Sequence, residues 1–422
     1  MYRSTHFMRV ALLSETYSPK MGYLETRLPK YLARLGAEVH VVAMDLPPYY
    51  QVRDFSETYG GFAEQLGAGI VENREGYTLH ILGHRKVAGH MRMQRLRQKL
   101  FVLRPHIVQT MVPIGWIPLD AAFWRRFLAY KLFTGSHHHA SVFPLASEPS
   151  RFLSWQRLRC VATRMIPGRL AGLATEKCYA ITEDCADIAM RFFGVPRRKV
   201  EICPLGVDTD LFHPVAGARD AAERAAVREA LGFSASDVVC IYTGRFSEGK
   251  NPLLLAQAIA GMRVRGEPYR GLFVGNGVQA AQIQECAGCV TQPFVPVWEL
   301  GALFRAADIG VWPTQESISM LDAAACALPI VANHTMAAGE RLAGNGRKYL
   351  LHDREDLVRV LLGLKTAETR ARLGACGARK MAQDFSWEAI AKKRLADYEV
   401  ALRPPKRAPQ GRPSAQLLGR AE

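Results

Sequence analysis

The residues with the clearest chemical potential are two acids and two cations in the second half of the chain. Glu316 and Asp322 flank the point where a loop, after the apolar strand 308–312, becomes a helix of small residues. Arg245 and Lys250 project from the loop that follows another apolar strand. In an open parallel sheet such loops lie at the carboxyl ends of the strands, where ligands bind. The sequence therefore predicts that the four side chains share one site.

Each pair suits a different part of a ligand. Arginine holds a diphosphate through two parallel hydrogen bonds, while lysine adds a point charge. A free helix N-terminus also attracts anions, whereas acids beside it are better placed to bind hydroxyls. The set predicts a ligand with both phosphates and hydroxyls, such as a nucleotide sugar. The alternative is a surface cation pair beside an ordinary strand–helix–strand unit with solvated acids.

The length and the amino-acid composition favour a globular protein of two α/β domains. The chain has 422 residues, of which 49% are hydrophobic and 22% charged. No uninterrupted apolar run approaches the roughly 18 residues that span a bilayer. Residues 8–14 have the pattern of a first core strand rather than of a signal peptide.

Cysteine and histidine positions argue against a metal centre. The nine cysteines are scattered, which is typical of reduced thiols in a cytosolic protein. Cys286 and Cys289 have metal-ligand spacing, but no second pair matches them. His137, His138 and His139 follow the predicted strand 132–136, and successive strand side chains point to opposite faces. Three such rings do not easily converge on one ion.

Alternating strand and helix patterns continue through most of the chain. Strand 9–14, helix 24–35 and strand 38–43 form one β-α-β unit, with Gly36 where a helix C-cap glycine belongs. The segment 199–212 contains Pro204-Leu205-Gly206-Val207-Asp208 and then Phe212. Further strands are predicted at 77–82, 106–110, 177–182, 238–242 and 272–274. Residues 215–236 are predicted to form a linker and a short helix.

This succession resembles the GT-B glycosyltransferases, and specifically glycosyltransferase family 4, over about residues 8 to 402. The resemblance rests on the Pro-x-Gly-Val-Asp segment, the Arg245–Lys250 pair and the acidic segment at 316–322. The acidic segment departs from the family pattern, because five residues rather than seven separate the acids and the second acid is Asp322. Ala327 also stands where the family has a glycine.

The resemblance implies two Rossmann-like α/β domains that face each other across a cleft. It places an acceptor-binding domain at 1–210, a nucleotide-sugar-binding domain at 211–385 and a helix crossing back to the first domain at 386–402. Residues 403–422 are predicted to be a basic disordered tail.

The resemblance also assigns site residues. It implies that Arg245 and Lys250 neutralise the leaving diphosphate, that Glu316 holds the sugar ring, and that Asp322 holds ribose hydroxyls. His137 is implied to contact the transferred sugar, with His138 and His139 as register alternatives. His137, Arg245, Lys250 and Glu316 are thus the candidate catalytic residues. The candidate donor-binding residues are Gly22, Gly244, Arg245, Lys250, Gly275, Val295, Glu316, Ser319, Met320, Leu321 and Asp322.

The net charge of +16 is uneven, since residues 1–214 carry 28 basic and 18 acidic side chains. Residues 85–104 are predicted to be helical, and they are basic with interleaved apolar residues. Arg92, Arg95 and Lys99 in this segment are candidate contacts to an acceptor or to an anionic membrane surface. The alternative is a domain helix with a solvated basic face.

The predicted function is that of a retaining glycosyltransferase, which moves a hexose-type sugar from a nucleotide-diphosphate sugar to a glycan or lipid-linked acceptor. No metal or other cofactor is expected to be required. The predicted location is cytoplasmic and peripheral at the inner face of the membrane. The alternatives are a nucleotide-sugar 2-epimerase on the same fold and a noncatalytic GT-B partner protein.

Two other classes are disfavoured. Residues 17–23 lack the Gly-x-Gly-x-x-Gly pattern of a nicotinamide dehydrogenase. Nucleic-acid binding is not predicted, because the basic segments carry no recognition motif.

Overall fold

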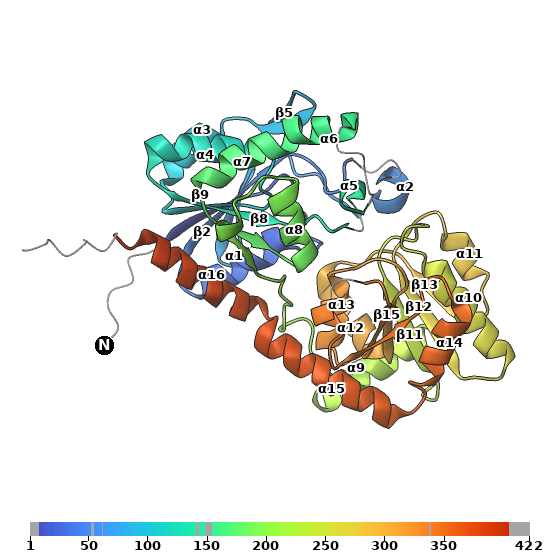
Figure 1. Ribbon diagram of the computed structural model, residues 1–422. Helices are drawn as coiled ribbons and strands as arrows, with labels where there is room; N and C mark the ends of the chain where they lie inside the picture. Colours follow the sequence, from blue (N-terminus) through green and yellow to red (C-terminus); the bar gives the residue numbers. More distant parts are fainter. Residues whose placement is uncertain are drawn as a thin grey trace, which may run out of the picture.

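The computed structural model describes residues 8–51, 55–60, 62–140, 143–147, 154–336 and 339–404. Within them the chain forms two α/β domains, each built around its own sheet (Figure 1). A cavity lined by residues of both domains lies between them. The predicted α/β class and GT-B architecture are confirmed. Among the described residues, no helix combines the length and the apolar character that crossing a bilayer requires.

The first domain contains an eight-stranded sheet with the order β10-β9-β8-β7-β1-β2-β4-β3. All neighbouring pairs are parallel except β3 with β4. The strands are β1 (Arg9–Leu13), β2 (Glu38–Met44), β3 (Val71–Arg74), β4 (Tyr77–Leu82), β7 (Ile107–Thr110), β8 (Lys131–Ser136), β9 (Thr175–Ala180) and β10 (Val200–Ile202). The helices are α1 (Leu24–Arg34), α2 (Phe55–Tyr59), α3 (Leu96–Leu103), α4 (Trp116–Leu128), α5 (Pro144–Ser147), α6 (Trp155–Cys160), α7 (Ile166–Ala174) and α8 (Glu183–Arg191), with a π-helical turn, η2 (Val161–Met165), between α6 and α7.

The first β-α-β unit forms where its pattern predicts it. β1 and β2 are parallel, with Leu12 beside Val41, and both side chains are fully buried because helices cover both faces of the sheet. Helix α1 ends at a glycine C-cap, since Gly36 has a φ of 93° and donates to the carbonyl of Ala33. The loop between β1 and α1 therefore lies at the carboxyl edge of this sheet.

The prediction of a helix across residues 85–104 is wrong in its first half. β5 (His84–Val87) and β6 (His90–Met93) form an antiparallel hairpin, and α3 begins only at Leu96. Ala88 and Gly89 both have positive φ, 49° and 81°, which is the backbone of a tight two-residue hairpin turn. The basic spacing is helical, but this turn reverses the chain before a helix can start.

The second domain contains a six-stranded, wholly parallel sheet with the order β13-β12-β11-β14-β15-β16. The strands are β11 (Val238–Thr243), β12 (Tyr269–Val274), β13 (Cys289–Gln292), β14 (Ile309–Trp312), β15 (Ile330–Asn333) and β16 (Gly346–Tyr349). The helices are α9 (Gly217–Ala230), α10 (Pro252–Val264), α11 (Ala280–Gln284), α12 (Val297–Ala306), α13 (Ser319–Ala325), α14 (Arg354–Leu362), α15 (Ala367–Asp384) and α16 (Trp387–Leu402). The short helix expected within 215–236 is thus the 14-residue helix α9.

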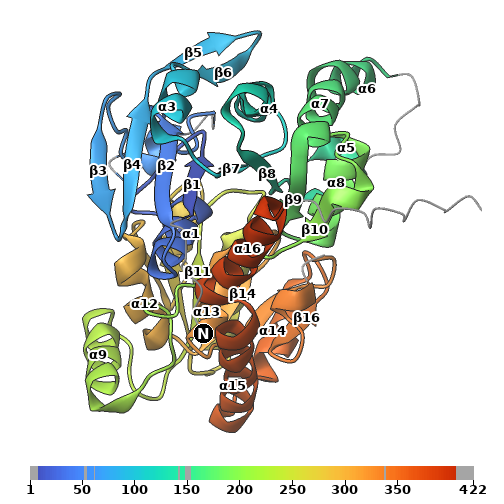
Figure 2. The ribbon, with the colours of Figure 1, turned by 90° about the vertical axis from the view of Figure 1, so that its left-hand side faces the viewer.

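The two domains are joined both through residues 203–216 and through the C-terminal helices. Val207 forms a parallel bridge with Ser386, just before α16 begins. Helices α15 and α16 run in succession along the second and then the first domain (Figure 2). In α16, Arg394 lies over the Tyr179 ring at 3.8 Å and donates to Gln109, both in the first sheet. These contacts show that α16 packs on the first domain. The residue boundaries predicted for the domains stay a prediction.

Candidate functional site

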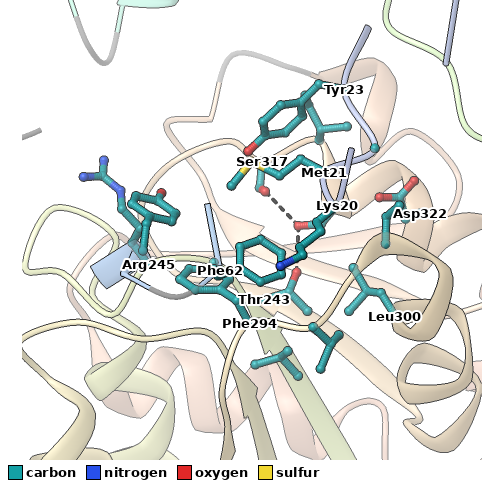
Figure 3. Close-up of a pocket in the computed structure, with 18 of the residues that line it drawn as sticks. Lys20, Met21, Tyr23, Phe62, Thr243, Arg245, Phe294, Leu300, Ser317 and Asp322 are labelled. Carbon is teal, nitrogen blue, oxygen red and sulfur yellow. Dashed lines mark hydrogen bonds between the residues drawn. The ribbon is translucent and has the colours of Figure 1, made fainter. Parts of the chain in front are cut away.

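A cavity of about 350 Å³ lies between the carboxyl edges of the two sheets. Its first-domain wall is the loop 20–23 together with Tyr49, Tyr59 and Phe62. Its second-domain wall comes from the loops that follow β11, β13 and β14 (Figure 3). Eight of the eleven predicted donor-binding residues line it, namely Gly22, Gly244, Arg245, Lys250, Val295, Glu316, Ser319 and Asp322.

Three cationic residues line this cavity: Lys20 of the first domain, and Arg245 and Lys250 on the loop between β11 and α10. Lys250 donates from Nζ to the backbone carbonyl of Glu316 at 2.8 Å, which ties the cationic loop to the acidic loop. Burial is the main cause that lowers the pKa of Lys250 to about 8, and nearby Arg245 acts in the same direction. Within the described residues, Arg245 has no carboxylate within ion-pair distance. The loop therefore keeps a cation available for an anionic ligand.

The acidic loop carries hydroxyls as well as carboxylates. Ser319, the first residue of α13, has its hydroxyl 2.7 Å from those of Thr243 and Ser317. Burial raises the pKa of Asp322 to about 8, which Arg27 only partly offsets. A carboxyl with such a pKa exchanges a proton near neutral pH, so it can donate a hydrogen bond to a ligand hydroxyl or accept one.

Two glycines are required by close approach. A Cβ on Gly275, whose φ is 152°, would lie 1.9 Å from the carbonyl oxygen of Gly244. A Cβ on Gly22 would lie 2.6 Å from Cγ2 of Val297 in the opposite domain. Gly275 thus shapes the turn behind the cations, and Gly22 lets the two domains touch.

Three predicted donor-binding residues do not reach the cavity. Met320 and Leu321 are in the hydrophobic core, with 0% and 1% of their surface exposed. Gly275 lies behind Gly244 rather than on the cavity wall. The family spacing located α13 correctly, but only one face of that helix points into the cavity.

A second cavity, of about 420 Å³, adjoins the first on the first-domain side. Glu316, Ser317, Ile318, Tyr23 and Tyr49 line both cavities. The acidic loop is therefore the wall that the two cavities share.

The three successive histidines have different surroundings. His137 and His139 line the second cavity, whereas the ring of His138 packs edge-on against Phe193, 5.1 Å between centroids. Burial is the main cause that lowers the pKa of His137 to about 3, so this ring is neutral, and its Nε2 is buried without a hydrogen-bond partner in the described structure. Of the register alternatives, His137 is the neutral ring that faces the cavity.

His139 belongs to a charged pair. Burial acts to lower its pKa, but hydrogen bonds to Asp184 and Cys185 outweigh it and raise the pKa to about 9. The possible metal-ligand atoms of His139, Asp184 and Cys185 lie within 4.8 Å of one another. The Asp184 carboxylate already accepts from His139, from the Thr182 hydroxyl and from the Ala140 amide. These contacts explain why His139, Asp184 and Cys185 lie together: His139 and Asp184 form an ion pair that is supported by hydrogen bonds.

The predicted acceptor or membrane residues lie outside both cavities. Arg92 forms a two-point ion pair with Asp120 and lies 4.6 Å from the Trp116 ring centroid. The Nζ atom of Lys99 lies 3.3 Å from Nδ1 of His80. Arg95, directly before α3, is exposed and has a φ of 55°. Because Arg92 is already neutralised, it offers little charge to an anionic surface.

Sequence reasoning missed several cavity residues. Glu25 in the first turn of α1 lines the second cavity, and burial raises its pKa to about 7. Arg341 lines the same cavity and donates to the carbonyl of Ser317 at 3.1 Å. Aromatic residues of the first cavity were also missed, namely Tyr23, Tyr49, Tyr59, Phe62 and Phe294. Glu25 could have been found from the sequence, because it is an acid three residues after the predicted site residue Gly22.

Two α/β domains with parallel strands, joined by a crossing C-terminal helix and sharing a cavity, define the GT-B class of protein. Residues 26–211 match the family model described as Glycosyltransferase Family 4, and residues 237–366 match Glycosyl transferases group 1. The chain belongs to these glycosyltransferases, with a family 4 first domain and a group 1 second domain.

Curated relatives share this family. A D-inositol 3-phosphate glycosyltransferase of Geodermatophilus obscurus is 30% identical over 246 residues, which are 54% of this chain and 53% of the relative. One with the same name from Kineococcus radiotolerans is 26% identical, covering 95% of this chain and 97% of the relative. In its matches to the first three such relatives, the chain spans only about half of their length.

Solved structures share the fold. A glycosyltransferase from Rickettsia africae is 12% identical with a TM-score of 0.67, covering 94% of this chain and 99% of that one. Anabaena HepE in complex with UDP is 14% identical with a TM-score of 0.67, covering 94% and 100%. At these identities the likeness is one of fold.

Proposed function

We propose that the protein is a retaining glycosyltransferase that moves a hexose-type sugar from a nucleotide-diphosphate sugar to a glycan or lipid-linked acceptor. The observation that carries this proposal is one cavity that is lined both by the cations Arg245 and Lys250 and by the acids Glu316 and Asp322. Cations suit the diphosphate, and the acids and hydroxyls suit the ribose and the sugar. Anabaena HepE, which has the same fold, was crystallised with UDP and with UDP-glucose.

Charge stabilisation is the main catalytic device in this proposal. As the bond from the anomeric carbon to the diphosphate breaks, the sugar gains oxocarbenium character and the phosphate oxygen gains negative charge. Arg245 and Lys250 stabilise that charge, so no metal ion or other cofactor is required. Burial makes such stabilisation stronger than it would be in water.

The wall shared by the two cavities is the place for the transferred sugar. Glu316 borders both cavities, so its carboxylate reaches a sugar that extends from the donor cavity toward the acceptor cavity. His137 lines the second cavity with a neutral ring, which can contact the transferred sugar without adding charge. Glu25, with a pKa of about 7, is placed to accept a proton from an acceptor hydroxyl near neutral pH.

Closure of the cleft would limit hydrolysis of the donor. Both domains supply walls to the donor cavity, and the Val297 amide donates across the cleft to the Lys20 carbonyl at 2.9 Å. Water is excluded only while the two domains are together.

A lipid-linked acceptor is supported by one face of the first domain. Exposed apolar side chains of α4, α6, η2 and α7 gather there, and we name them the α4–α7 face: Phe123, Phe127, Trp155, Leu158, Val161, Met165, Ile166, Leu170 and Leu173. Residues 154–174 contain four arginines and no acid. Such a face suits the anionic inner surface of a membrane, which makes the proposed location cytoplasmic and peripheral.

A phosphorylated polyol is the second candidate acceptor. The Kineococcus relative, matched over nearly its whole length, is named as an inositol 3-phosphate glycosyltransferase. The second cavity carries Arg341, a cation that suits a phosphate on the acceptor.

The experiment is sugar transfer from UDP-, GDP- and ADP-sugars to a lipid-linked sugar in anionic vesicles or to soluble inositol phosphate. We expect release of nucleoside diphosphate that depends on an acceptor, with the product keeping the donor's anomeric configuration by NMR. Lys250→Met should lower turnover by about 10²-fold or more, whereas Lys348→Met, at an exposed site of the same domain, should not.

The other outcomes separate the alternatives. Conversion of the nucleotide sugar to its 2-epimer without acceptor would identify the epimerase. Absence of both reaction and nucleotide binding would favour the remaining alternative, a noncatalytic GT-B partner protein. Equal turnover of inositol phosphate and of the lipid-linked sugar would reject a lipid-specific acceptor.

A further inference from the structure

Helix α7 turns its small residues toward the protein and its large apolar residues toward solvent. Its buried residues are two glycines and an alanine, and a Cβ on Gly168 would lie 2.1 Å from the carbonyl oxygen of Phe193. The outward residues Ile166, Leu170 and Leu173 are 54%, 58% and 53% exposed. An amphipathic helix on the surface of a soluble domain has the opposite arrangement. The outward side of α7 is therefore suited to contact with an apolar partner.

A groove of about 560 Å³ lies between α7 and α4, which are neighbours in the first domain (Figure 2). We call it the helix groove. Helix α4 packs on the core through another stripe, which includes Ile117 and Ala121. Six apolar side chains form the walls of the groove, at helical spacing on each helix: Leu119, Ala122 and Phe123 of α4, and Leu170, Leu173 and Ala174 of α7.

The helix groove is also lined by a cation that no acid neutralises. Arg126, in the last turn of α4, is exposed and has no carboxylate within ion-pair distance among the described residues. Its neighbour Arg125 is paired with Glu176. The exposed rings of Phe123 and Phe127 lie 5.8 Å apart on the same helix. Apolar and aromatic side chains beside free arginines suit a ligand that has an apolar body and an anionic head.

The helix groove is remote from the cavity proposed for the acceptor. The ends of α4 and α7 that carry Arg126 and Ala174 lead into the first residues of β8 and β9. His137, which lines the second cavity, follows the other end of β8. Because β8 has six residues, roughly 20 Å separates its two ends. A ligand at this end of the groove is therefore a molecule other than the group that receives the sugar.

We propose that the helix groove holds one hydrocarbon chain of an anionic membrane phospholipid, with the lipid phosphate at Arg126. This inference rests on the proposed membrane contact and extends it from adsorption on a surface to a defined lipid site. Each methylene of the chain leaves water when it enters the groove, which favours binding. The phosphate gives Arg126 the counter-charge that the described part of the chain does not supply. The lipid thus holds the protein on the membrane while both cavities stay free for donor and acceptor.

Single-chain lipids below their micelle concentration test this site without a membrane. By calorimetry, the wild type should bind octyl, decyl and dodecyl lysophosphatidylglycerol with an affinity that rises up to about fourfold per methylene. Glycerol phosphate, which has no chain, should not bind. Ala122→Trp fills the groove from α4, and Leu170→Ser removes part of its wall. Each variant should weaken binding of the dodecyl lipid by about tenfold.

Two matched controls separate the groove from the rest of the α4–α7 face. Ile166 is on the same helix as Leu170 and similarly exposed, but it does not line the groove. Ile166→Ser should therefore lower binding to vesicles and keep the affinity for single chains. Arg126→Gln should weaken binding of dodecyl lysophosphatidylglycerol by about fivefold and leave that of dodecyl maltoside, whose head is uncharged, as it is. Arg169→Gln, at an exposed arginine of α7 outside the groove, should change neither.

The possible results separate this inference from the proposed membrane contact. A wild type that floats with anionic vesicles but binds no single chain would overturn the inference and leave the membrane contact intact. Equal loss of chain binding in Ile166→Ser and Leu170→Ser would also overturn it, since lipid would then adsorb without a defined site. Competition between the dodecyl lipid and the sugar acceptor would assign the groove to the acceptor instead, and self-association that Ala122→Trp abolishes would assign it to a second copy of the chain. Absence of any vesicle binding would remove the membrane contact, and the inference with it.

Discussion

At the scale of single residues, the donor cavity depends on cations kept partly out of water. Lys250 is tied to the acidic loop through the carbonyl of Glu316, and Arg245 has no carboxylate within ion-pair distance in the described part of the chain. A buried cation without a full counter-charge is costly to the protein. The arrangement becomes favourable when an anion enters, which is the behaviour expected of a diphosphate site.

The lowered pKa of Lys250 predicts how ligand affinity depends on pH. The ammonium is charged below a pKa of about 8 and loses its proton above it, so affinity for a nucleoside diphosphate should fall as pH rises from 7 to 9. Lys250→Arg should bind with little pH dependence in this range, because guanidinium stays charged. Calorimetry at pH 6, 7, 8 and 9 checks this. A wild-type profile as flat as that of Lys250→Arg would contradict it.

Residue chemistry could be predicted from the sequence only where the residues are close along the chain. Arg245 and Lys250 share one loop, and Glu316 and Asp322 share another, so their spacing was informative. The cavity rings of Tyr49, Tyr59 and Phe294 are far apart in the sequence, and only the fold brings them together. Met320 and Leu321 were assigned by the family spacing, but the helical turn directs their side chains into the core.

At the scale of elements, α1 is held to the connection between the domains by one buried carboxylate. Asp208 accepts from Arg27, Lys30 and Tyr31, at distances from 2.7 to 3.0 Å. Burial opposes ionisation of Asp208, but its hydrogen bonds to Lys30 and Tyr31 outweigh burial and lower its pKa. The loop that carries Gly22 directly precedes α1, so this contact also positions one wall of the donor cavity.

We expect Asp208→Asn to destabilise the protein by about 3 kcal/mol, because Arg27 and Lys30 would keep only longer contacts to the half-exposed carboxylates of Glu75 and Asp210. Asp210→Asn is the matched control, since its ion pair with Arg34 is half exposed and worth at most about 1 kcal/mol. Urea denaturation at pH 7 measures both. Because the folded pKa of Asp208 is lowered, its contribution is present above the unfolded pKa and is lost as pH falls through the folded pKa. Equal stability of the two variants would contradict the assignment.

Periodicity alone predicted most of the core strands but failed at the hairpin β5–β6. Apolar strands such as β1, β4 and β14 are buried on both faces, and this leaves a clear sequence pattern. Residues 84–93 mix basic and apolar side chains, and their conformation is decided by the turn at Ala88 and Gly89. The basic, partly apolar pattern was therefore assigned to a helix that begins only at Leu96.

At the scale of the whole molecule, the chain crosses between the domains twice, through residues 203–216 and through α15 and α16. Arg394 is almost fully buried against the first domain, where it contacts Tyr179 and Gln109. The two crossings meet at the Val207–Ser386 bridge, beside Gly206, where a Cβ would lie 2.7 Å from the Trp387 ring. Closure of the cleft would then be expected to pivot near this point.

The membrane contact proposed for the α4–α7 face can be tested with lipid vesicles. Wild type should float with anionic vesicles at low salt and less at high salt, because arginines supply part of the attraction. Trp155→Ser with Ile166→Ser should lower this binding at least fivefold. Val264→Ser, which removes an exposed apolar side chain from the second domain, should leave it unchanged. Equal loss in the control, or binding to neutral vesicles alone, would contradict the proposed surface.

The measurement that tests the central claim most directly is the thermal stability of wild type and Arg245→Ala with UDP, GDP, ADP and CMP. We predict that at least one diphosphate raises the melting temperature of the wild type, by an amount equivalent to about 2.7 kcal/mol at one hundred times its Kd. The increase should be lost in Arg245→Ala and kept in Arg347→Ala, which changes an exposed arginine of the same domain. No shift with any nucleotide, or an equal shift in Arg245→Ala, would contradict a diphosphate site in this cavity.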